Sequence, residues 1–171
     1  MMNGTIIKGI GGFYYVHTGD AVYECRARGR FRLEEHSPLV GDRVEILPEE
    51  GKLFGYITEI HERKNSLRRP PVANVDQFAL VIAASVPKPD LLLCDKLLLQ
   101  SALNGVSSLI IVNKTDEAQS SLTETLSFEY SRSGAKLLFV SAKTGDGLSA
   151  LSDELSGRIT CLAGQSAVGK S

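Results

Sequence analysis

Several features are scarce in this sequence, and each scarcity excludes a class of protein. Cysteines number three, at Cys25, Cys94 and Cys161, which is too few and too dispersed for a disulfide framework or a zinc site. We expect three buried free thiols, because unpaired cysteine buries readily. The longest apolar run covers residues 78–86 with one serine inside it, far short of the roughly 20 residues that cross a bilayer.

An excess of charge of either sign is also missing. Lys and Arg number 19 against 20 Asp and Glu, so a strongly basic protein is excluded although a local basic patch is not. Residues 1–5 lack the basic and apolar pattern of a secretory signal. With 43% hydrophobic and 23% charged residues, the composition is that of a globular protein. We expect a cytoplasmic protein without a membrane partner.

The first part of the chain has the pattern of a small all-β domain. Short runs of Ile, Val, Tyr and Phe alternate with glycine, proline and acidic turns, which predicts strands at residues 5–10, 13–17, 22–31, 43–47 and 54–61. Five short strands without a helical period favour a closed barrel. We predict an OB-type barrel over residues 1–68, with an SH3-like barrel as the alternative, and interpret its aromatic residues mainly as core.

One predicted strand of this barrel carries arginine at every second position. The four residues are Arg26, Arg28, Arg30 and Arg32. Because side chains alternate between the faces of a strand, all four would project from one face. Such a stripe suits the phosphates of RNA. The alternative is a solvated outer face whose charge is balanced by neighbouring glutamates.

The pattern changes after the Arg-Arg-Pro-Pro run at residues 68–71, because proline restricts its own backbone and that of its predecessor. We place a domain boundary after residue 68. Residues 69–171 alternate between predicted strands at 77–84, 108–112, 136–140 and 159–163 and predicted helices at 91–103, 120–133 and 148–155. This alternation predicts an α/β domain with a mostly parallel sheet, in which ligands bind at the carboxyl ends of the strands.

The segment after the last predicted strand has the glycines, lysine and serine of a P-loop at the required spacing. It comprises Gly164, Gln165, Ser166, Ala167, Val168, Gly169, Lys170 and Ser171. The backbone N–H groups of such a loop bind phosphate. Lys170 would reach the β and γ phosphates and is the candidate catalytic residue, and the Ser171 hydroxyl would bind Mg²⁺.

Polar residues also follow the second and third predicted strands of this domain, and they indicate guanine. The candidate guanine-binding residues are Asn113, Lys114, Asp116, Ser141, Ala142 and Lys143. The Asp116 carboxylate can accept the two adjacent donors of guanine, whereas adenine would leave it unpaired. We expect Asn113 to join its loop to the neighbouring loops, the Lys114 stem to lie on the purine face, and the Ala142 N–H to bind the guanine carbonyl oxygen.

These motifs also carry a family resemblance. Asn-Lys-Thr-Asp at residues 113–116 resembles the fourth GTPase motif, Ser-Ala-Lys at 141–143 the fifth, and the P-loop the first. The order four, five, one is that of a circularly permuted GTPase. With the preceding barrel, the chain resembles the bacterial ribosome small subunit-dependent GTPases. The resemblance implies hydrolysis of GTP to GDP with Mg²⁺, a barrel that binds the rRNA of the small ribosomal subunit, and a role in the late maturation of that subunit. We expect a monomer.

The sequence stops at Ser171, within the P-loop. The resemblance implies that the second and third GTPase motifs and a zinc-binding C-terminal domain lie beyond it, so we expect residues 1–171 alone to hydrolyse GTP at no useful rate. Two other functions stay open. One is an RNA-binding barrel protein with a vestigial nucleotide site, which the intact P-loop disfavours. The other is an adenine-nucleotide kinase, which Asp116 disfavours.

Overall fold

The computed structural model describes residues 1–27, 29, 31, 37–118 and 120–170. The chain divides into two compact units, Met1–Asn74 and Val75–Ser171. The sequence places this boundary six residues earlier, after residue 68. The difference arises because residues 66–73 form a hairpin of β6 (Ser66–Arg68) and β7 (Pro71–Ala73), which is tied to the barrel unit by a bridge between Val40 and Val72.

This hairpin corrects the interpretation of the Arg-Arg-Pro-Pro run as a break in regular structure. Arg68 pairs with Pro71 across the hairpin. The second proline is the first residue of its strand, a position at which proline is tolerated. The Asn74 amide, just after β7, donates to the Gly41 carbonyl at 3.0 Å.

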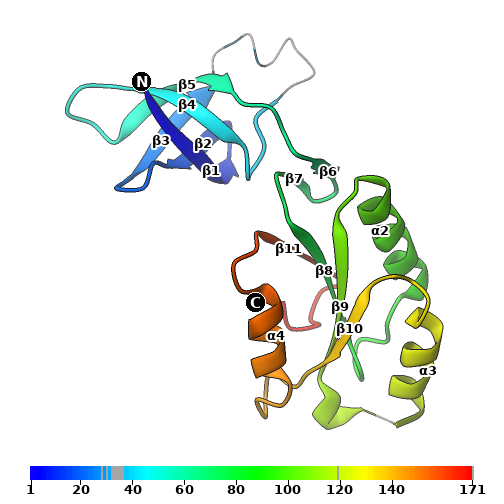
Figure 1. Ribbon diagram of the computed structural model, residues 1–171. Coiled ribbons are helices and arrows are strands. Elements are labelled where there is room, and N and C mark those ends of the chain that lie inside the picture. Colours follow the sequence, from blue (N-terminus) through cyan, green and yellow to red (C-terminus); the bar gives the residue numbers. More distant parts are fainter. Residues whose placement is uncertain (28, 30, 32–36, 119, 171) are drawn as a thin grey trace. The chain divides into compact units, whose positions relative to one another are not determined.

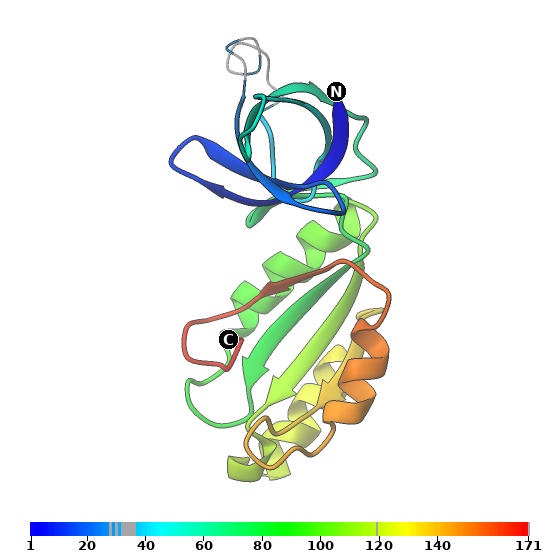
Figure 2. The ribbon, with the colours of Figure 1, turned by 90° about the vertical axis from the view of Figure 1, so that its left-hand side faces the viewer.

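The first unit is a closed five-stranded barrel. Its strands are β1 (Met2–Ile10), β2 (Phe13–His17), β3 (Val22–Ala27), β4 (Arg43–Pro48) and β5 (Phe54–Ile60). They pair in the order β1-β2-β3-β5-β4, with β3 parallel to β5 and the other pairs antiparallel, and Figure 2 shows the barrel as a closed ring. The predicted OB-type barrel is therefore confirmed. Its core includes the buried side chains of Ile6, Val16, Cys25, Val44, Ile46 and Ile57.

Strand β3 is shorter than predicted. It ends at Ala27, and Gly29 lies in a turn. The prediction of one strand over residues 22–31 is wrong at this point, because a glycine weakens the interior of a strand and favours a bend. Strand alternation therefore does not place the four arginines on one face. Arg28, Arg30 and Arg32 lie outside the described residues.

The second unit is an α/β layer structure, as predicted. Its elements are β8 (Gln77–Ala83), α2 (Leu91–Leu103), β9 (Ser107–Asn113), η1 (Thr115–Glu117), α3 (Ser120–Tyr130), β10 (Lys136–Phe139), α4 (Leu148–Leu155) and β11 (Thr160–Ala163). The sheet has the order β10-β9-β8-β11 and all three pairs are parallel. Helices α2 and α3 cover one face of the sheet and α4 the other (Figure 1).

Local sequence explains where these elements begin and end. All seven residues of β8 are buried, as expected for a strand covered on both faces. Helix α2 begins where the Asp90 carboxylate accepts from the Leu93 N–H at 3.0 Å. Helix α3 ends at Tyr130 rather than at residue 133, because the Ser133 hydroxyl donates to the Tyr130 carbonyl at 2.8 Å and so competes with the helical pattern.

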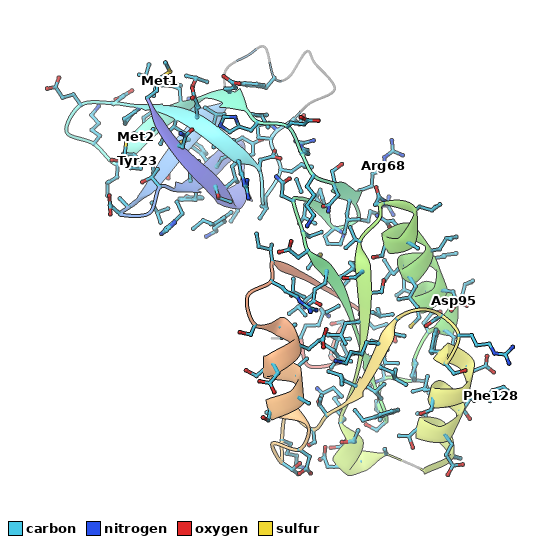
Figure 3. The ribbon with its side chains drawn as sticks, viewed as in Figure 1. Met1, Met2, Tyr23, Arg68, Asp95 and Phe128 are labelled. Carbon is cyan, nitrogen blue, oxygen red and sulfur yellow. The ribbon has the colours of Figure 1, made fainter. Side chains whose placement is uncertain are left out.

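Side chains of α2 and α3 also meet. The Tyr130 hydroxyl donates to Asp95 at 3.1 Å. Phe128, by contrast, lies on the outer side of α3 (Figure 3) and is 79% exposed.

The three cysteines are free and buried, as predicted. Burial raises the pKa of the Cys25 and Cys94 thiols to about 11, so both are neutral at physiological pH. Within the described ranges, no helix is long and apolar enough to cross a bilayer.

Candidate functional site

The three sequence motifs lie at one edge of the parallel sheet. Residues 113–116 begin at the last residue of β9, residues 141–143 follow β10 and residues 164–171 follow β11. Because all four strands run in one direction, their carboxyl ends meet at the same edge. Strand β8 ends there too, and the segment after it, in green, lies beside the P-loop, in red (Figure 2).

Two glycines allow the P-loop to pack directly on the sheet. Gly164 has a φ of +145°, and a Cβ there would lie 2.1 Å from the Val81 carbonyl oxygen of β8. Gly169 has a φ of +92°, and a Cβ there would lie 2.3 Å from Nδ2 of Asn113. Ala167 has a φ of 63°, in the left-handed region that non-glycine residues adopt mainly where the surroundings enforce it, often at functional sites. No side chain could replace either glycine without moving its neighbours.

Lys170 turns back on its own loop. Its ammonium donates to the Gln165 carbonyl, so the positive charge lies over the P-loop backbone. A phosphate in the loop would compete with this carbonyl for the ammonium. Ser171, the candidate Mg²⁺ ligand, lies outside the described residues.

Asn113 connects the P-loop with the loop after β10. Its side chain is buried, with the residue 5% exposed. Nδ2 donates to the Val168 carbonyl at 3.0 Å, and Oδ1 accepts from the Ala142 N–H at 3.1 Å. These bonds fix the amide orientation and bring all three motifs into one site.

The second of these bonds occupies a group that the sequence assigns to guanine. The Ala142 N–H was expected to bind the guanine carbonyl oxygen, and in the structure it donates to Asn113. A base oxygen would have to share this N–H with Asn113 or take its place.

The carboxylate of Asp116 is held from two sides by the loop after β10. The buried Ser141 hydroxyl donates to Oδ1 at 2.7 Å, and the exposed Lys143 ammonium lies 3.5 Å from Oδ2. The Ser141 hydrogen bond is the main cause that lowers the pKa of Asp116, and Lys143 lowers it further. Asp116 is therefore ionised at physiological pH, with a side chain 14% exposed. It remains available as an acceptor.

Lys114 takes a left-handed backbone conformation, with φ 64° and ψ 38°. Its ammonium donates to the Val86 carbonyl at 2.6 Å. The side chain thus spans from the loop after β9 to the segment after β8, and its stem is fixed at both ends.

Sequence reasoning missed the segment after β8 as part of this site. The Ser85 hydroxyl donates to Glu117 at 3.1 Å, and the Asp90 N–H donates to the Gln165 side chain at 3.1 Å. The position of residues 85–90 could have indicated this role, because they follow a buried parallel strand just as the three motifs do.

In the barrel, only Arg26 of the four predicted RNA-binding arginines is described. It is exposed, and its guanidinium lies 4.6 Å from the centre of the Phe13 ring, a cation–π distance. Tyr14 and Tyr23 pack against the barrel core, in agreement with their interpretation as core residues. Tyr15 is held by a hydrogen bond from its hydroxyl to Glu24 at 3.1 Å.

Comparisons with known proteins match both units. The model for the RsgA GTPase matches residues 60–171, and that for the RsgA N-terminal domain matches residues 3–57. The chain is 44% identical over 170 residues to the small ribosomal subunit biogenesis GTPase RsgA of Caldanaerobacter subterraneus, covering 99% of this chain and 57% of that protein. It is 42% identical over 174 residues to the protein of that name from Halalkalibacterium halodurans, covering 100% and 59%.

Two solved structures share the fold over nearly the whole chain. YjeQ from Thermotoga maritima has a TM-score of 0.82 at 33% identity, covering 99% of this chain and 62% of that one. YloQ, described as a circularly permuted GTPase, has a TM-score of 0.75 at 37% identity, covering 99% and 61%.

Fold and site together define a circularly permuted GTPase fold preceded by an OB-type barrel. The chain belongs to the RsgA GTPase family. It spans 57–59% of the length of the two curated relatives named above.

Proposed function

We propose that this chain binds GTP with Mg²⁺ and, within its full-length gene product, hydrolyses GTP to GDP during late maturation of the small ribosomal subunit. The observation that carries the proposal is the pair of hydrogen bonds at Asn113, which donates to the Val168 carbonyl and accepts from the Ala142 N–H. They unite the phosphate loop with both base loops at the edge of the sheet where ligands of such folds bind.

Guanine selection is assigned to Asp116. Its ionised carboxylate can accept N1–H and the N2 amine of guanine together, while Ser141 holds it in place. Adenine offers an acceptor at N1 instead, so it would place an acceptor against the carboxylate and supply neither of these two donors. The stem of Lys114, anchored at Val86, supports the face of the purine. Asn113 and Asp116 serve the base and take no part in the chemistry at the γ phosphate.

The donor set of the P-loop fits a nucleotide phosphate with Mg²⁺. At two positions of the loop the close packing leaves room only for glycine, and Lys170 supplies a positive charge and donates to a backbone carbonyl. Mg²⁺ bound with GTP would offset the phosphate charge, and the motif provides the Ser171 hydroxyl as its protein ligand. Lys170 would stabilise the charge that develops at the phosphate during transfer.

The barrel is assigned to ribosomal RNA. Its support is the family to which the chain belongs, the RsgA N-terminal match over residues 3–57, and the exposed Arg26 beside an aromatic ring. Arg28, Arg30 and Arg32 are proposed to add to this basic surface. We propose that the protein acts as a cytoplasmic monomer.

Release of phosphate from GTP tests this proposal. The full-length gene product is assayed alone, with purified small ribosomal subunits, and with large subunits as the control. We expect small subunits to stimulate turnover and large subunits to leave it unchanged. Equal turnover in all three samples contradicts the ribosomal role. RNA binding without any hydrolysis favours the alternative of a vestigial nucleotide site.

A further inference from the structure

Residues 85–90, which make up most of the segment between β8 and α2, hydrogen-bond to both the base side and the phosphate side of the nucleotide site although they belong to none of the GTPase motifs. We call them the β8–α2 loop. It makes one hydrogen bond to η1, one to the residue after β9, and one to the P-loop.

On the base side, the β8–α2 loop fixes two side chains. Its Val86 carbonyl accepts from the Lys114 ammonium at 2.6 Å, a charge-assisted bond of the stronger kind. Its Ser85 hydroxyl donates to Glu117 at 3.1 Å, and Glu117 in turn lies 3.8 Å from the Lys143 ammonium. This loop therefore sets where the Lys114 stem lies relative to the expected position of the purine.

On the phosphate side, the β8–α2 loop holds the P-loop through Asp90. The Asp90 backbone N–H donates to Oε1 of Gln165 at 3.1 Å, while the Asp90 carboxylate caps α2. The Gln165 carbonyl, on the same residue, accepts from Lys170. Asp90, at the start of α2, thus fixes the conformation in which Gln165 accepts the hydrogen bond from the catalytic Lys170.

We propose that the β8–α2 loop is a positioning element that couples the guanine loop to the P-loop, an inference that rests on the proposed nucleotide function. Within the described part of the chain, Lys114 and Gln165 do not hydrogen-bond to each other, yet both hydrogen-bond to these six residues. Removing either hydrogen bond frees the loop, so the remaining hydrogen bond then loses its effect on nucleotide affinity. The two residues act on nucleotide affinity as one unit.

A double-mutant cycle measures this coupling directly. Lys114→Met removes the ammonium and keeps an unbranched stem, and Gln165→Ala removes the acceptor of the Asp90 N–H. Fluorescent GDP is titrated into the full-length gene product and the three variants, whose thermal midpoints are recorded to show that each is folded. We expect each single change to raise Kd about 3- to 10-fold, the effect of one hydrogen bond, and the double variant to be no weaker than the weaker single variant.

A second cycle supplies the matched control. Thr144 lies in the loop after β10, and its hydroxyl donates to the Asp146 carboxylate at 2.7 Å rather than to the β8–α2 loop. Thr144→Ala combined with Gln165→Ala should give the product of the two single fold-changes. The coupling is overturned if the fold-changes in Kd of Lys114→Met and Gln165→Ala multiply in the double variant. It is also overturned if Kd is unchanged in both single variants. Absence of GDP binding by the wild-type protein overturns the proposed function itself, and the coupling with it.

Discussion

The amide nitrogen of Asn113 lies 3.0 Å from the Val168 carbonyl oxygen, 55 residues further along the chain. The oxygen of the same amide accepts from Ala142 at 3.1 Å. One buried side chain therefore joins three motifs that lie far apart in the sequence of this domain. The site depends on spatial order at the sheet edge and not on the order of motifs in the sequence.

Asn113→Ala should weaken both the fold and nucleotide binding. The substitution leaves the Ala142 N–H and the Val168 carbonyl without their partner, and an unsatisfied buried group costs about 1–3 kcal/mol. We expect a free energy of unfolding lower by about that amount in urea, and a GDP affinity at least about tenfold weaker, because a loss of 1.4 kcal/mol is a factor of ten. Asn104→Ala is the control, since that amide is exposed and donates to the Gln100 carbonyl of its own helix. Equal affinities for wild type and Asn113→Ala would argue against the bridge.

Guanine affinity should depend on pH through Asp116. The Ser141 hydrogen bond lowers the pKa of this carboxyl, so the ionised form is favoured in the folded protein. Guanine needs the ionised carboxylate, so its affinity is fully present above the pKa of Asp116 in the folded protein and is lost as pH falls through that lowered value. Ser141→Ala removes the main cause, so affinity for fluorescent GDP should begin to fall at a higher pH than in wild type. A wild-type midpoint between about pH 6 and 7 would assign the effect to a histidine instead.

Gly169→Ala should disrupt the P-loop, and Gly145→Ala provides a matched comparison. Both glycines have a φ near +90°, but a Cβ at Gly169 would meet Asn113 at 2.3 Å whereas one at Gly145 meets nothing within 4 Å. Gly145→Ala should cost only the backbone strain, about 1–2 kcal/mol. Gly169→Ala adds a steric conflict and should abolish measurable GDP binding. Similar thermal midpoints and affinities for the two variants would contradict this packing.

Arg63→Ala should destabilise the barrel unit. Arg63 binds both oxygens of the fully buried Asp42 at 2.7 and 2.8 Å and also donates to the Ser37 carbonyl. Removing the guanidinium leaves a buried carboxylate with its charge unpaired, which costs about 3 kcal/mol or more. Lys52→Ala breaks the exposed pair with Glu49 and should cost less than about 1 kcal/mol. Urea unfolding of both variants measures the difference, and a loss below 1 kcal/mol for Arg63→Ala would show that the pair is not a major contributor.

Much of the fold was predictable because local signals agreed with the tertiary structure. Helix α2 was predicted over its full length, since Asp90 provides an N-cap and Gly105, with a φ of +66°, a stop. Strand β3 was predicted too long because alternating arginines imitate a strand beyond Ala27. The β6–β7 hairpin was missed because proline was interpreted as a break, and its pairing depends on partners that local sequence does not specify.

The motifs that form the site could be predicted from the sequence, but the hydrogen-bond partners of their residues could not. The spacing of Gly164, Gly169 and Lys170 defines a P-loop in any protein that contains it. That Asn113 takes the Ala142 N–H, or that Lys114 anchors on Val86, depends on the meeting of loops from different strands. The β8–α2 loop was missed for the same reason, because its bonds to Lys114 and Gln165 use backbone groups that every sequence possesses.

The most direct measurement is a titration of the full-length gene product with fluorescent GDP, followed by competition with unlabelled GTP and then ATP. A site built around Asp116 and the P-loop predicts displacement by GTP and none by a large excess of ATP. Displacement by both nucleotides, or no binding of GDP, would contradict the guanine site and leave the barrel and RNA as the basis of function.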